Sequence, residues 1–371
     1  MKRTIALDCR MIGRSGVGRY VESILDEITS QDIEDFQFLL VGPCERLSQY
    51  SNRKNIAGIE SYEIEPLSLR DTLEGTRFFI RLSKKVDLIH FTHFNLPLFA
   101  PRNSVVTIHD LTPLILKELF PVGKRFSLSL LLRLNKRRIR RFIAVSQSTK
   151  NDLAQLLGIP SEKVEVIYER VSSRLVHCDR ILPEELRGRE YFLYVGNKKR
   201  HQNLDTAIRA FDVFFDDHPD WKFVIAGKKD KQRDYVDETL ENVRNRSCFI
   251  EYDGPSDETL AGLYSNTRGV VLLSLYEGFG LPVIEGFAFG KPAIVSNRSS
   301  LLEIVGEAGI VVNADSVEEL SLFASRVAKD NVLYGNLCVE AGNRFSFFDT
   351  YCELEKLKAL YHDAIGHSRF A

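Results

Sequence analysis

Two glutamates in this chain, Glu277 and Glu285, are spaced so that their carboxylates could bind the same ligand. They lie eight residues apart within SLYEGFGLPVIEGFAFGK (274–291), directly after the apolar run GVVLLS. The glycines between them let the backbone approach a ligand, and Pro282 suits the first turn of a helix, in which we expect Glu285 to lie. Carboxylates accept hydrogen bonds from hydroxyls and phosphate oxygens accept them from backbone N–H groups, so this arrangement suits a phosphorylated polyol. In the plain alternative, Glu285 interacts only with its own helix terminus and Glu277 is solvated.

Other polar residues follow other expected strands. GRSGVGRY (13–20) follows the first strand and opens a helix, as the glycine turn of a dinucleotide site does, but Val21 stands where the third glycine would be. Gly16 and Gly18 therefore either lie against a diphosphate or an acceptor, or only form a tight strand–helix turn. His109 ends the strand SVVTIHD, where a histidine is either structural or in contact with a ligand.

Composition limits the classes of protein that the chain could belong to. It has 371 residues, which corresponds to two domains of about 150–200 residues, and its formal net charge of −1 gives it no electrostatic reason to bind nucleic acid. Six scattered cysteines form no C-x-x-C pair and indicate free thiols in a reducing compartment. The start MKRTIALDCR lacks a signal-peptide core, and no apolar run approaches ~20 residues, so we expect a cytoplasmic protein.

Short apolar runs alternate with helix-like segments along the chain, which predicts parallel sheets covered by helices on both faces. The expected strands are 4–8, 36–42, 87–91, 104–110, 142–146 and 163–168 in the first half, and 191–196, 222–227, 247–254, 269–274, 292–297 and 309–314 in the second. A polar stretch at 172–190 interrupts the pattern and predicts a linker. We therefore expect an α/β protein of two Rossmann-like, doubly wound domains, 1–175 and 186–350, with a C-terminal helix in 351–371 that returns to the N-terminal domain.

Taken in order, these motifs resemble the retaining glycosyltransferases of family 4, which have the GT-B fold. In the second half the resemblance is carried by YVGNKKRHQNLDTAIRAF, DGPSDETLAGLYSN (253–266), the E-x7-E segment and SNRSSLLEIVGEAG (296–309). In the first half it is carried by DCRMIGRSGVGRY (8–20), VVTIHDLTPL (105–114) and AVSQSTKNDL (144–153). The resemblance implies two Rossmann-like domains that face each other across a cleft, which closes on the substrate and excludes water.

The resemblance also implies roles for individual residues. Glu277 would contact hydroxyls of the donor sugar, Glu285 would hold the ribose of the nucleotide, and His109 would position sugar hydroxyls. The remaining positions that the resemblance assigns to the donor are Gly16, Gly18, Gly278, Phe279, Gly280 and Leu281.

The implied reaction transfers a hexose from a nucleotide-diphosphate sugar to a hydroxyl of a glycan or lipid-linked saccharide in surface polysaccharide synthesis, with retention. The acceptor attacks on the face that the diphosphate leaves, and Glu277 orients the sugar without bonding to it. The HDLTP and SLYEGFGLP segments look most like bacterial mannosyltransferases, which favours GDP-mannose over the UDP-hexoses. No D-x-D occurs in the sequence, so we expect no metal and no other cofactor.

The sequence departs from the family in the loop after YVG. The family carries basic residues there that neutralise the diphosphate, whereas this chain has Asn197 and Gln202. A cation at this place stabilises charge that develops in the transition state. We therefore expect Lys199, Arg200 or Lys228 to supply it, unless these side chains are only solvated surface charges.

Residues 123–142 carry eight Lys or Arg residues and no acid on a stretch that is rich in Leu and Phe. This pattern predicts a basic amphipathic helix that is drawn to an anionic membrane surface, here the inner face of the cell membrane. In the alternative, the helix buries its Leu face in its own domain and only its basic face is solvated.

Three other functions compete with transfer. A non-catalytic GT-B protein that binds a sugar nucleotide, or scaffolds an enzyme, would explain Asn197 and Gln202, but Glu277, Glu285 and His109 argue against it. An NAD-dependent oxidoreductase rests on GVGRYV and the α/β alternation, and it is weakened by the missing third glycine. A sugar-nucleotide epimerase of the same fold is the third, and the family motifs favour transfer.

Overall fold

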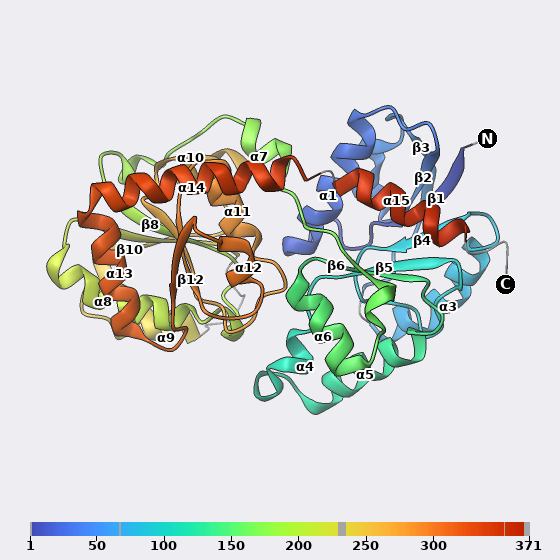
Figure 1. Ribbon diagram of the computed structural model, residues 1–371, viewed down its shortest axis with the longest axis horizontal. Coiled ribbons are helices and arrows are strands. Elements are labelled where there is room, and N and C mark those ends of the chain that lie inside the picture. The colour runs from blue at the N-terminus through green and yellow to red at the C-terminus, as the bar shows by residue number, and fades with distance from the viewer. Residues whose placement is uncertain (1, 67, 229–234, 352, 367–371) are drawn as a thin grey trace. The chain divides into compact units, whose positions relative to one another are not determined.

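The computed structural model of the chain describes residues 2–66, 68–228, 235–351 and 353–366. The chain divides into two compact units (Figure 1). Unit 1 contains Met1–Ser172 and Cys352–Ala371, and unit 2 contains Ser173–Tyr351. The stretch for which the sequence predicts a linker packs on unit 2 in the structure, where the backbone N–H of Ile181 donates to the carbonyl of Glu258 at 3.0 Å.

Unit 1 is built on a seven-stranded sheet with the order β3-β2-β1-β4-β5-β6-β7. Its strands are Arg3–Asp8 (β1), Phe36–Gly42 (β2), Ile56–Ser61 (β3), Leu88–Phe91 (β4), Ser104–Ile108 (β5), Arg141–Ala144 (β6) and Val164–Val166 (β7). Each recorded strand pair is parallel. The central strands β4 and β5 are buried along their whole length, as the continuous apolar runs predict.

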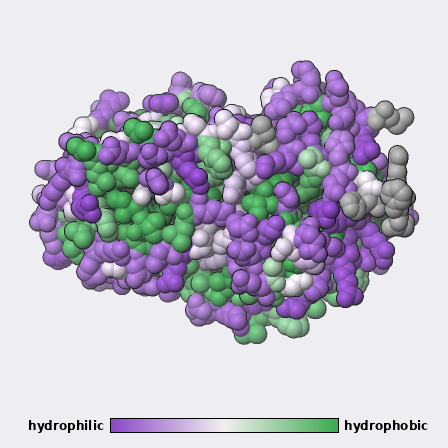
Figure 2. Space-filling view, viewed as in Figure 1, coloured by the Kyte–Doolittle hydropathy of each residue, from purple (hydrophilic) through white to green (hydrophobic). Residues whose placement is uncertain are grey.

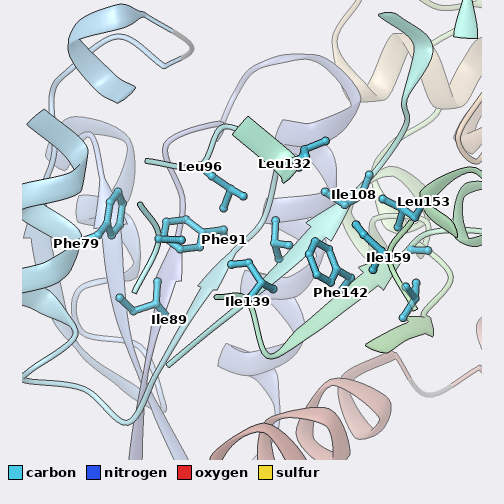
Figure 3. Close-up of a cluster of buried hydrophobic side chains, with 14 of the residues drawn as sticks. Phe79, Ile89, Phe91, Leu96, Ile108, Leu132, Ile139, Phe142, Leu153 and Ile159 are labelled. Carbon is cyan, nitrogen blue, oxygen red and sulfur yellow. The ribbon is translucent and has the colours of Figure 1, made fainter. Parts of the chain in front are cut away.

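Helices cover both faces of this sheet. They are Ser15–Ser30 (α1), Cys44–Leu47 (α2), Leu69–Leu82 (α3), Thr112–Ile115 (α4), Val122–Asn135 (α5), Gln147–Leu157 (α6) and Glu353–Gly366 (α15). Figure 3 shows one core, in which Phe79 of α3, Leu132 of α5 and Leu153 of α6 pack with Phe91 of β4 and Phe142 of β6. The helices α3, α5 and α6 therefore form one layer over a single face of the sheet.

The other face of the sheet is covered by α1 and α15. Successive side chains of a strand point to opposite faces, so His90 lies on the side opposite Phe91. The His90 Nδ1 is 2.7 Å from the hydroxyl of Tyr361 on α15, and its Nε2 is 2.8 Å from the hydroxyl of Thr107. Helix α15 therefore packs on unit 1, although it follows unit 2 in the sequence.

Unit 2 is built on a six-stranded sheet with the order β10-β9-β8-β11-β12-β13, and its recorded pairs are parallel. Its strands are Tyr191–Val195 (β8), Lys222–Ala226 (β9), Phe249–Tyr252 (β10), Gly269–Leu272 (β11), Ala293–Ser296 (β12) and Gly309–Val312 (β13). Its helices are Ser173–His177 (α7), Leu204–Asp217 (α8), Tyr235–Glu241 (α9), Asp257–Asn266 (α10), Leu281–Ala288 (α11), Leu301–Val305 (α12), Val317–Lys329 (α13) and Asn331–Asp349 (α14).

Each sheet has a point at which the strand order reverses direction. In unit 2 this point lies between β8 and β11, and in unit 1 it lies between β1 and β4. Ligands of doubly wound sheets bind beyond the carboxyl ends of the strands at such a point. The loops that follow β8 and β11 are therefore the first place to look for a site in unit 2.

Candidate functional site

Glu277 lies in the loop after β11 and is half-buried. Its Oε1 accepts hydrogen bonds from the amide of Gln202 and from the hydroxyl of Ser274, both at 2.9 Å. Its backbone N–H donates to the hydroxyl oxygen of Ser299 at 2.7 Å. An amide and a hydroxyl therefore orient this carboxylate.

The pairing of β8 with β11 explains how Gln202 reaches Glu277. The Nδ2 of Asn203 donates to the carbonyl of Leu273 at 3.2 Å, and the N–H of Leu275 donates to the carbonyl of His201 at 2.8 Å. These bonds fasten the loop after β8 to the loop after β11. Asn203 has a φ of 55°, a left-handed conformation that asparagine tolerates better than most residues. The position that the sequence analysis treats as a lost cation thus holds Glu277 in place.

Glu285 is buried, with 2% of its surface exposed. Helix α11 begins at Leu281 after Gly280, whose φ of 106° favours glycine. The prediction that Glu285 lies in the first turn is wrong, because the helix begins four residues before it and its first turn contains no acidic residue. Instead, the hydroxyl of Tyr264 on α10 donates to Oε2 of Glu285 at 2.6 Å.

The segment between the two glutamates is tied to its own unit. The hydroxyl of Ser300 donates to the carbonyls of Glu277 and Phe279, both at 2.9 Å. The ring of Phe279 is buried against Phe348, with 6.0 Å between the ring centroids, so this side chain packs in the core. Gly278 is also buried and Leu281 is half-buried. Contact of these residues with a donor stays a prediction, and for Phe279 it would involve the backbone.

The basic residues of the loop after β8 differ in their exposure and in their partners. Lys198 is buried and its ammonium group pairs with Glu251. Lys199 and Arg200 are exposed, and the guanidinium of Arg200 lies 5.4 Å from the centroid of the Tyr235 ring. Lys228, after β9, is exposed too. These three cations are therefore accessible to an anion, and Lys229 lies outside the described residues.

Gly16 and Gly18, in unit 1, lie in the first turn of α1 and differ in their surroundings. A Cβ atom at Gly18 would come within 2.9 Å of the backbone N of Gly13 and 3.0 Å of the carbonyl oxygen of Met11. Gly18 is thus required for the tight turn between β1 and α1. A Cβ atom at Gly16 would meet no atom within 4 Å, so open space adjoins this position.

His109, also in unit 1, is buried and both of its ring nitrogens have partners. Nδ1 is 2.6 Å from Oε1 of Glu169, and Nε2 is 2.8 Å from the carbonyl oxygen of Thr92. A carboxylate and a carbonyl can both accept hydrogen bonds, so this geometry suits a ring with a proton on each nitrogen. Burial by itself would lower the pKa of His109, but the hydrogen bonds and the charge of Glu169 raise it above its ordinary value. To contact a sugar, the ring would have to give up one of these bonds.

Several residues that position the glutamates carry no clear signal in the sequence. Ser299 and Tyr264 contact a glutamate only because of the tertiary fold, whereas Ser274 lies three residues before Glu277 and Gln202 is visible only as a departure from the family pattern. Ser274 follows an expected strand directly, and this placement could have suggested it.

Two general searches of the described residues gave no candidate. No three or more His, Cys, Asp or Glu side chains in this part of the chain are grouped so that they could hold a metal ion. No described helix is long and apolar enough to cross a membrane. Independence from metals stays a prediction.

Comparison with known families identifies both halves of the chain. Residues 182–343 match the model of the glycosyl transferases group 1, and residues 14–172 match the model of glycosyltransferase family 4. The first match lies within unit 2 and the second within unit 1, where β1 and α15 lie outside the matched residues.

Curated relatives are similar over part of their length. The chain is 26% identical to the O-antigen chain mannosyltransferase B of Escherichia coli over 66% of each protein. It is 29% identical to the O-antigen chain mannosyltransferase RfbU of Salmonella typhimurium over 64% of each protein. The chain thus spans about two thirds of the length of these relatives.

Among solved structures, Anabaena Alr3699/HepE in complex with UDP and glucose has the same fold. The TM-score is 0.74 at 16% identity, and the match covers 99% of this chain and 100% of that one. The family models, the mannosyltransferase relatives and this fold agree with one another. The chain belongs to the family 4 glycosyltransferases and has the GT-B fold.

Proposed function

We propose that this chain is a retaining hexosyltransferase that transfers a sugar from a nucleotide-diphosphate donor to a hydroxyl of a glycan or lipid-linked saccharide. The observation that carries the proposal is the pair of glutamates beyond β11, at the reversal of strand order in unit 2, with Glu277 oriented by Gln202 and Ser274. The O-antigen mannosyltransferases among the relatives support mannose as the sugar, and GDP-mannose as the donor.

Each part of the donor has a candidate partner in unit 2. Glu277 would accept hydrogen bonds from hydroxyls of the sugar, and Glu285, oriented by Tyr264, would accept them from the ribose. The diphosphate would meet the backbone N–H groups at the start of α11 and the exposed cations Lys199, Arg200 and Lys228. No metal ion is required in this scheme, because backbone dipoles and basic side chains meet the anionic charge.

The reaction forms a bond between the acceptor oxygen and the anomeric carbon and breaks the bond from that carbon to the diphosphate. The acceptor attacks on the face that the diphosphate leaves, and its proton passes to the departing phosphate oxygen. Glu277 holds the sugar throughout and forms no bond to it. His109 is assigned to the sugar by resemblance, and its bond to Thr92 would open to allow this contact.

A transfer assay tests the proposal. The chain is incubated with GDP-mannose, UDP-glucose and other nucleotide sugars together with saccharide acceptors, and the anomeric configuration of the product is read by NMR. The proposal expects transfer with retention from one donor class. A product with inverted configuration, or a covalent sugar adduct trapped on Glu277, would contradict it. Donor binding without turnover over a wide range of acceptors would favour the non-catalytic function that Asn197 and Gln202 suggest.

A further inference from the structure

The exposed hydrophobic side chains of unit 1 are confined to one region. Each large hydrophobic side chain that is exposed in the described part of unit 1 lies on α3, on α5 or in the loop between β4 and β5. They are Leu69, Leu73, Ile80, Phe99, Val122, Phe126, Leu130 and Leu134. Those of unit 2 are spread over four helices and the segment before β8. Single exposed hydrophobic residues are ordinary, but seven on two helices of one layer, with an eighth in the loop between β4 and β5, mark an interaction surface.

On α5 these residues form a stripe. Val122, Phe126, Leu130 and Leu134 follow one another at intervals of four residues, and their exposed fractions are 69%, 67%, 43% and 39%. Residues at this spacing lie on one face of a helix. The opposite face of α5 places Leu128 and Leu132 in the core that Figure 3 shows. Helix α5 is therefore apolar toward the sheet and also along its outer side.

The loop between β4 and β5 joins α5 to α3. The amide nitrogen of Asn135, at the end of α5, donates to the carbonyls of Pro97 and Leu98 at 3.3 and 3.2 Å. The N–H of Leu98 in turn donates to the carbonyl of Thr72 on α3 at 3.0 Å. Both helices belong to the layer over one face of the sheet, so their outer sides share one surface. We call α3 with residues 83–85, residues 97–100, and α5 with residues 136–138 the outer face of unit 1.

The outer face also carries positive charge that carboxylates do not cancel. Of the eight basic residues in 123–142, Arg141 pairs with Asp363 of α15, and the side chain of Arg140 donates to the carbonyl of Ala364. Within the described part of the chain, the other six have no ion pair, although three of them (Arg133, Lys136 and Arg138) donate to backbone carbonyls, as Arg140 does. They are Lys124, Arg125, Arg133, Lys136, Arg137 and Arg138. On α3 and just after it, Arg77, Arg81, Lys84 and Lys85 are exposed.

The structure also corrects the extent of the basic helix. The sequence predicts a single amphipathic helix over 123–142, but α5 ends at Asn135 and the chain then turns into β6. Arg140 and Arg141 face α15 rather than the outer face. Helix α3 and Phe99, which the basic run does not include, supply half of the exposed hydrophobic side chains.

We propose that the outer face of unit 1 docks on the surface of an anionic lipid bilayer. Exposed apolar side chains beside unpaired cations suit the boundary between acyl chains and anionic headgroups. A second copy of the chain suits this face less well, because a symmetric contact would bring the two basic surfaces together. The proposal is independent of the proposed transferase activity, because it rests on residues remote in sequence from Glu277 and Glu285.

Figure 2 shows a hydrophobic area on unit 2 with which the outer face of unit 1 can be compared. It shows hydrophobic residues at the lower edge of unit 1, where Figure 1 labels α4 and α5, and a second hydrophobic area on unit 2, where Figure 1 labels β12 and α13. On α13 and α14, exposed Leu322 and Val339 share their helices with both acidic and basic residues. These two positions are therefore matched controls, because they are apolar without an excess of cations.

The test is co-sedimentation of the full chain with vesicles of phosphatidylcholine alone or mixed with phosphatidylglycerol. The proposal expects binding to the mixed vesicles, at least tenfold weaker binding to the neutral ones, and release in 0.5 M NaCl, because salt screens surface charge. The variants F126S/L130S and K124E/R137E should each bind the mixed vesicles at least tenfold more weakly. The control L322S/V339S should bind like the wild type, and thermal unfolding of all variants should stay near that of the wild type because these side chains are exposed.

Three results would overturn the proposal. The first is equal binding to neutral and anionic vesicles, or no binding to either. The second is unchanged binding by the F126S/L130S and K124E/R137E variants. The third is a dimer of the wild type in solution that F126S/L130S disrupts, because this result would assign the outer face to contact between copies of the chain.

Discussion

The two units place polar side chains beyond the ends of their central strands, but they hold them in different ways. In unit 1 the carboxylates are paired with cations: Asp8 and Asp71 both contact Arg10, and Glu169 contacts His109. In unit 2, Glu277 accepts hydrogen bonds from an amide and a hydroxyl, and Glu285 accepts one from the hydroxyl of Tyr264.

The two kinds of partner have different consequences for the charge of a carboxylate. A buried ion pair cancels the charge of both partners, so it contributes mainly to the order of its own unit. A hydrogen bond from an amide or a hydroxyl orients a carboxylate and adds no positive charge beside it. The ion pairs of Arg10 therefore contribute to the order of unit 1, while binding of a donor by the two glutamates of unit 2 stays a prediction.

The largest expected effect is the loss of an ion pair in unit 1. Replacement of Arg10 by Met leaves Asp8 and Asp71 buried without their cation, and it should lower the free energy of unfolding by about 3–5 kcal/mol. Urea unfolding measures this change. The control is Arg14→Met, whose partner Glu65 is exposed, and it should cost less than about 1 kcal/mol. Equal losses of unfolding free energy in the two variants would contradict the special importance of the buried ion pairs.

Loss of charge at Glu277 should affect catalysis rather than folding. The Glu277→Gln variant keeps the size of the side chain, and we expect its rate of transfer at saturating donor to fall at least ~100-fold, or about 3 kcal/mol. Its thermal unfolding should change little. The control Glu318→Gln, at an exposed position on α13, should transfer at the rate of the wild type. A Glu277→Gln variant with full activity would remove this residue from the site.

Much of the fold can be predicted from the sequence, and the exception is instructive. Each of the expected strands is present, because a strand buried on both faces requires a continuous apolar run. Strand β3 is not expected from the sequence, because its residues IAGIES lie at the sheet edge, are only partly buried and include a glycine. The register between β2 and β3 shifts at Phe38 and Leu39, which further weakens the alternation that would reveal this strand.

The candidate site was predictable only in part. The glutamates, the glycines and Pro282 are close in sequence, so this segment, together with the family resemblance, predicts a ligand site. Apart from that of Ser274, three residues before Glu277, the side-chain contacts that orient them are not local: Gln202 and Glu277 are 75 residues apart, and Tyr264 and Glu285 are 21 apart. Such contacts follow from the pairing of β8 with β11 and from the packing of α10 against α11, which no local pattern encodes.

Glu353, also in unit 1, differs from the carboxylates of that unit that pair with cations. It is fully buried, and neither of its carboxyl oxygens has a hydrogen-bond partner among the described residues. Burial, and then the charges of Glu27 and Glu169, raise the pKa of Glu353 well above its ordinary value, although Arg170 lowers it. The folded state therefore keeps a proton that the unfolded state releases above about pH 4.5. The stability due to this proton is present below that pH and is lost as the pH rises through the pKa of the folded state.

Replacement of Glu353 by Met should therefore stabilise the chain. We expect the free energy of unfolding to rise by about 1–3 kcal/mol at pH 8. The rise should be smaller at pH 5, because less free energy is needed at that pH to keep Glu353 of the wild type protonated. Urea unfolding at the two pH values measures the difference. Glu355→Met, at an exposed position two residues further along α15, should show no such dependence on pH. A gain that is larger at pH 5 than at pH 8 would contradict the direction of the pKa shift.

The smallest effect concerns the orientation of Glu277. The Gln202→Leu variant removes one of the donors to this carboxylate, and we expect about tenfold slower transfer, or ~1.4 kcal/mol. The KM for the donor should change less than kcat if Gln202 only positions Glu277. Gln202→Asn, which keeps a shorter amide, should recover part of the rate. Equal activity of the Leu variant and the wild type would show that Ser274 alone is sufficient.

The most direct test of the central claim measures nucleotide binding in unit 2. Thermal unfolding is followed with UDP, GDP, CDP, TDP, ADP and NAD for the wild type, Glu285→Gln and the control Glu318→Gln. A ligand at 100 times its Kd adds about 2.7 kcal/mol to the stability of the protein that binds it. We expect one nucleoside diphosphate, GDP for a mannose donor, to stabilise the wild type and the control but not Glu285→Gln. Stabilisation by none of the nucleotides, or equal stabilisation of the Glu285→Gln variant, would contradict the claim that these glutamates bind a nucleotide-sugar donor.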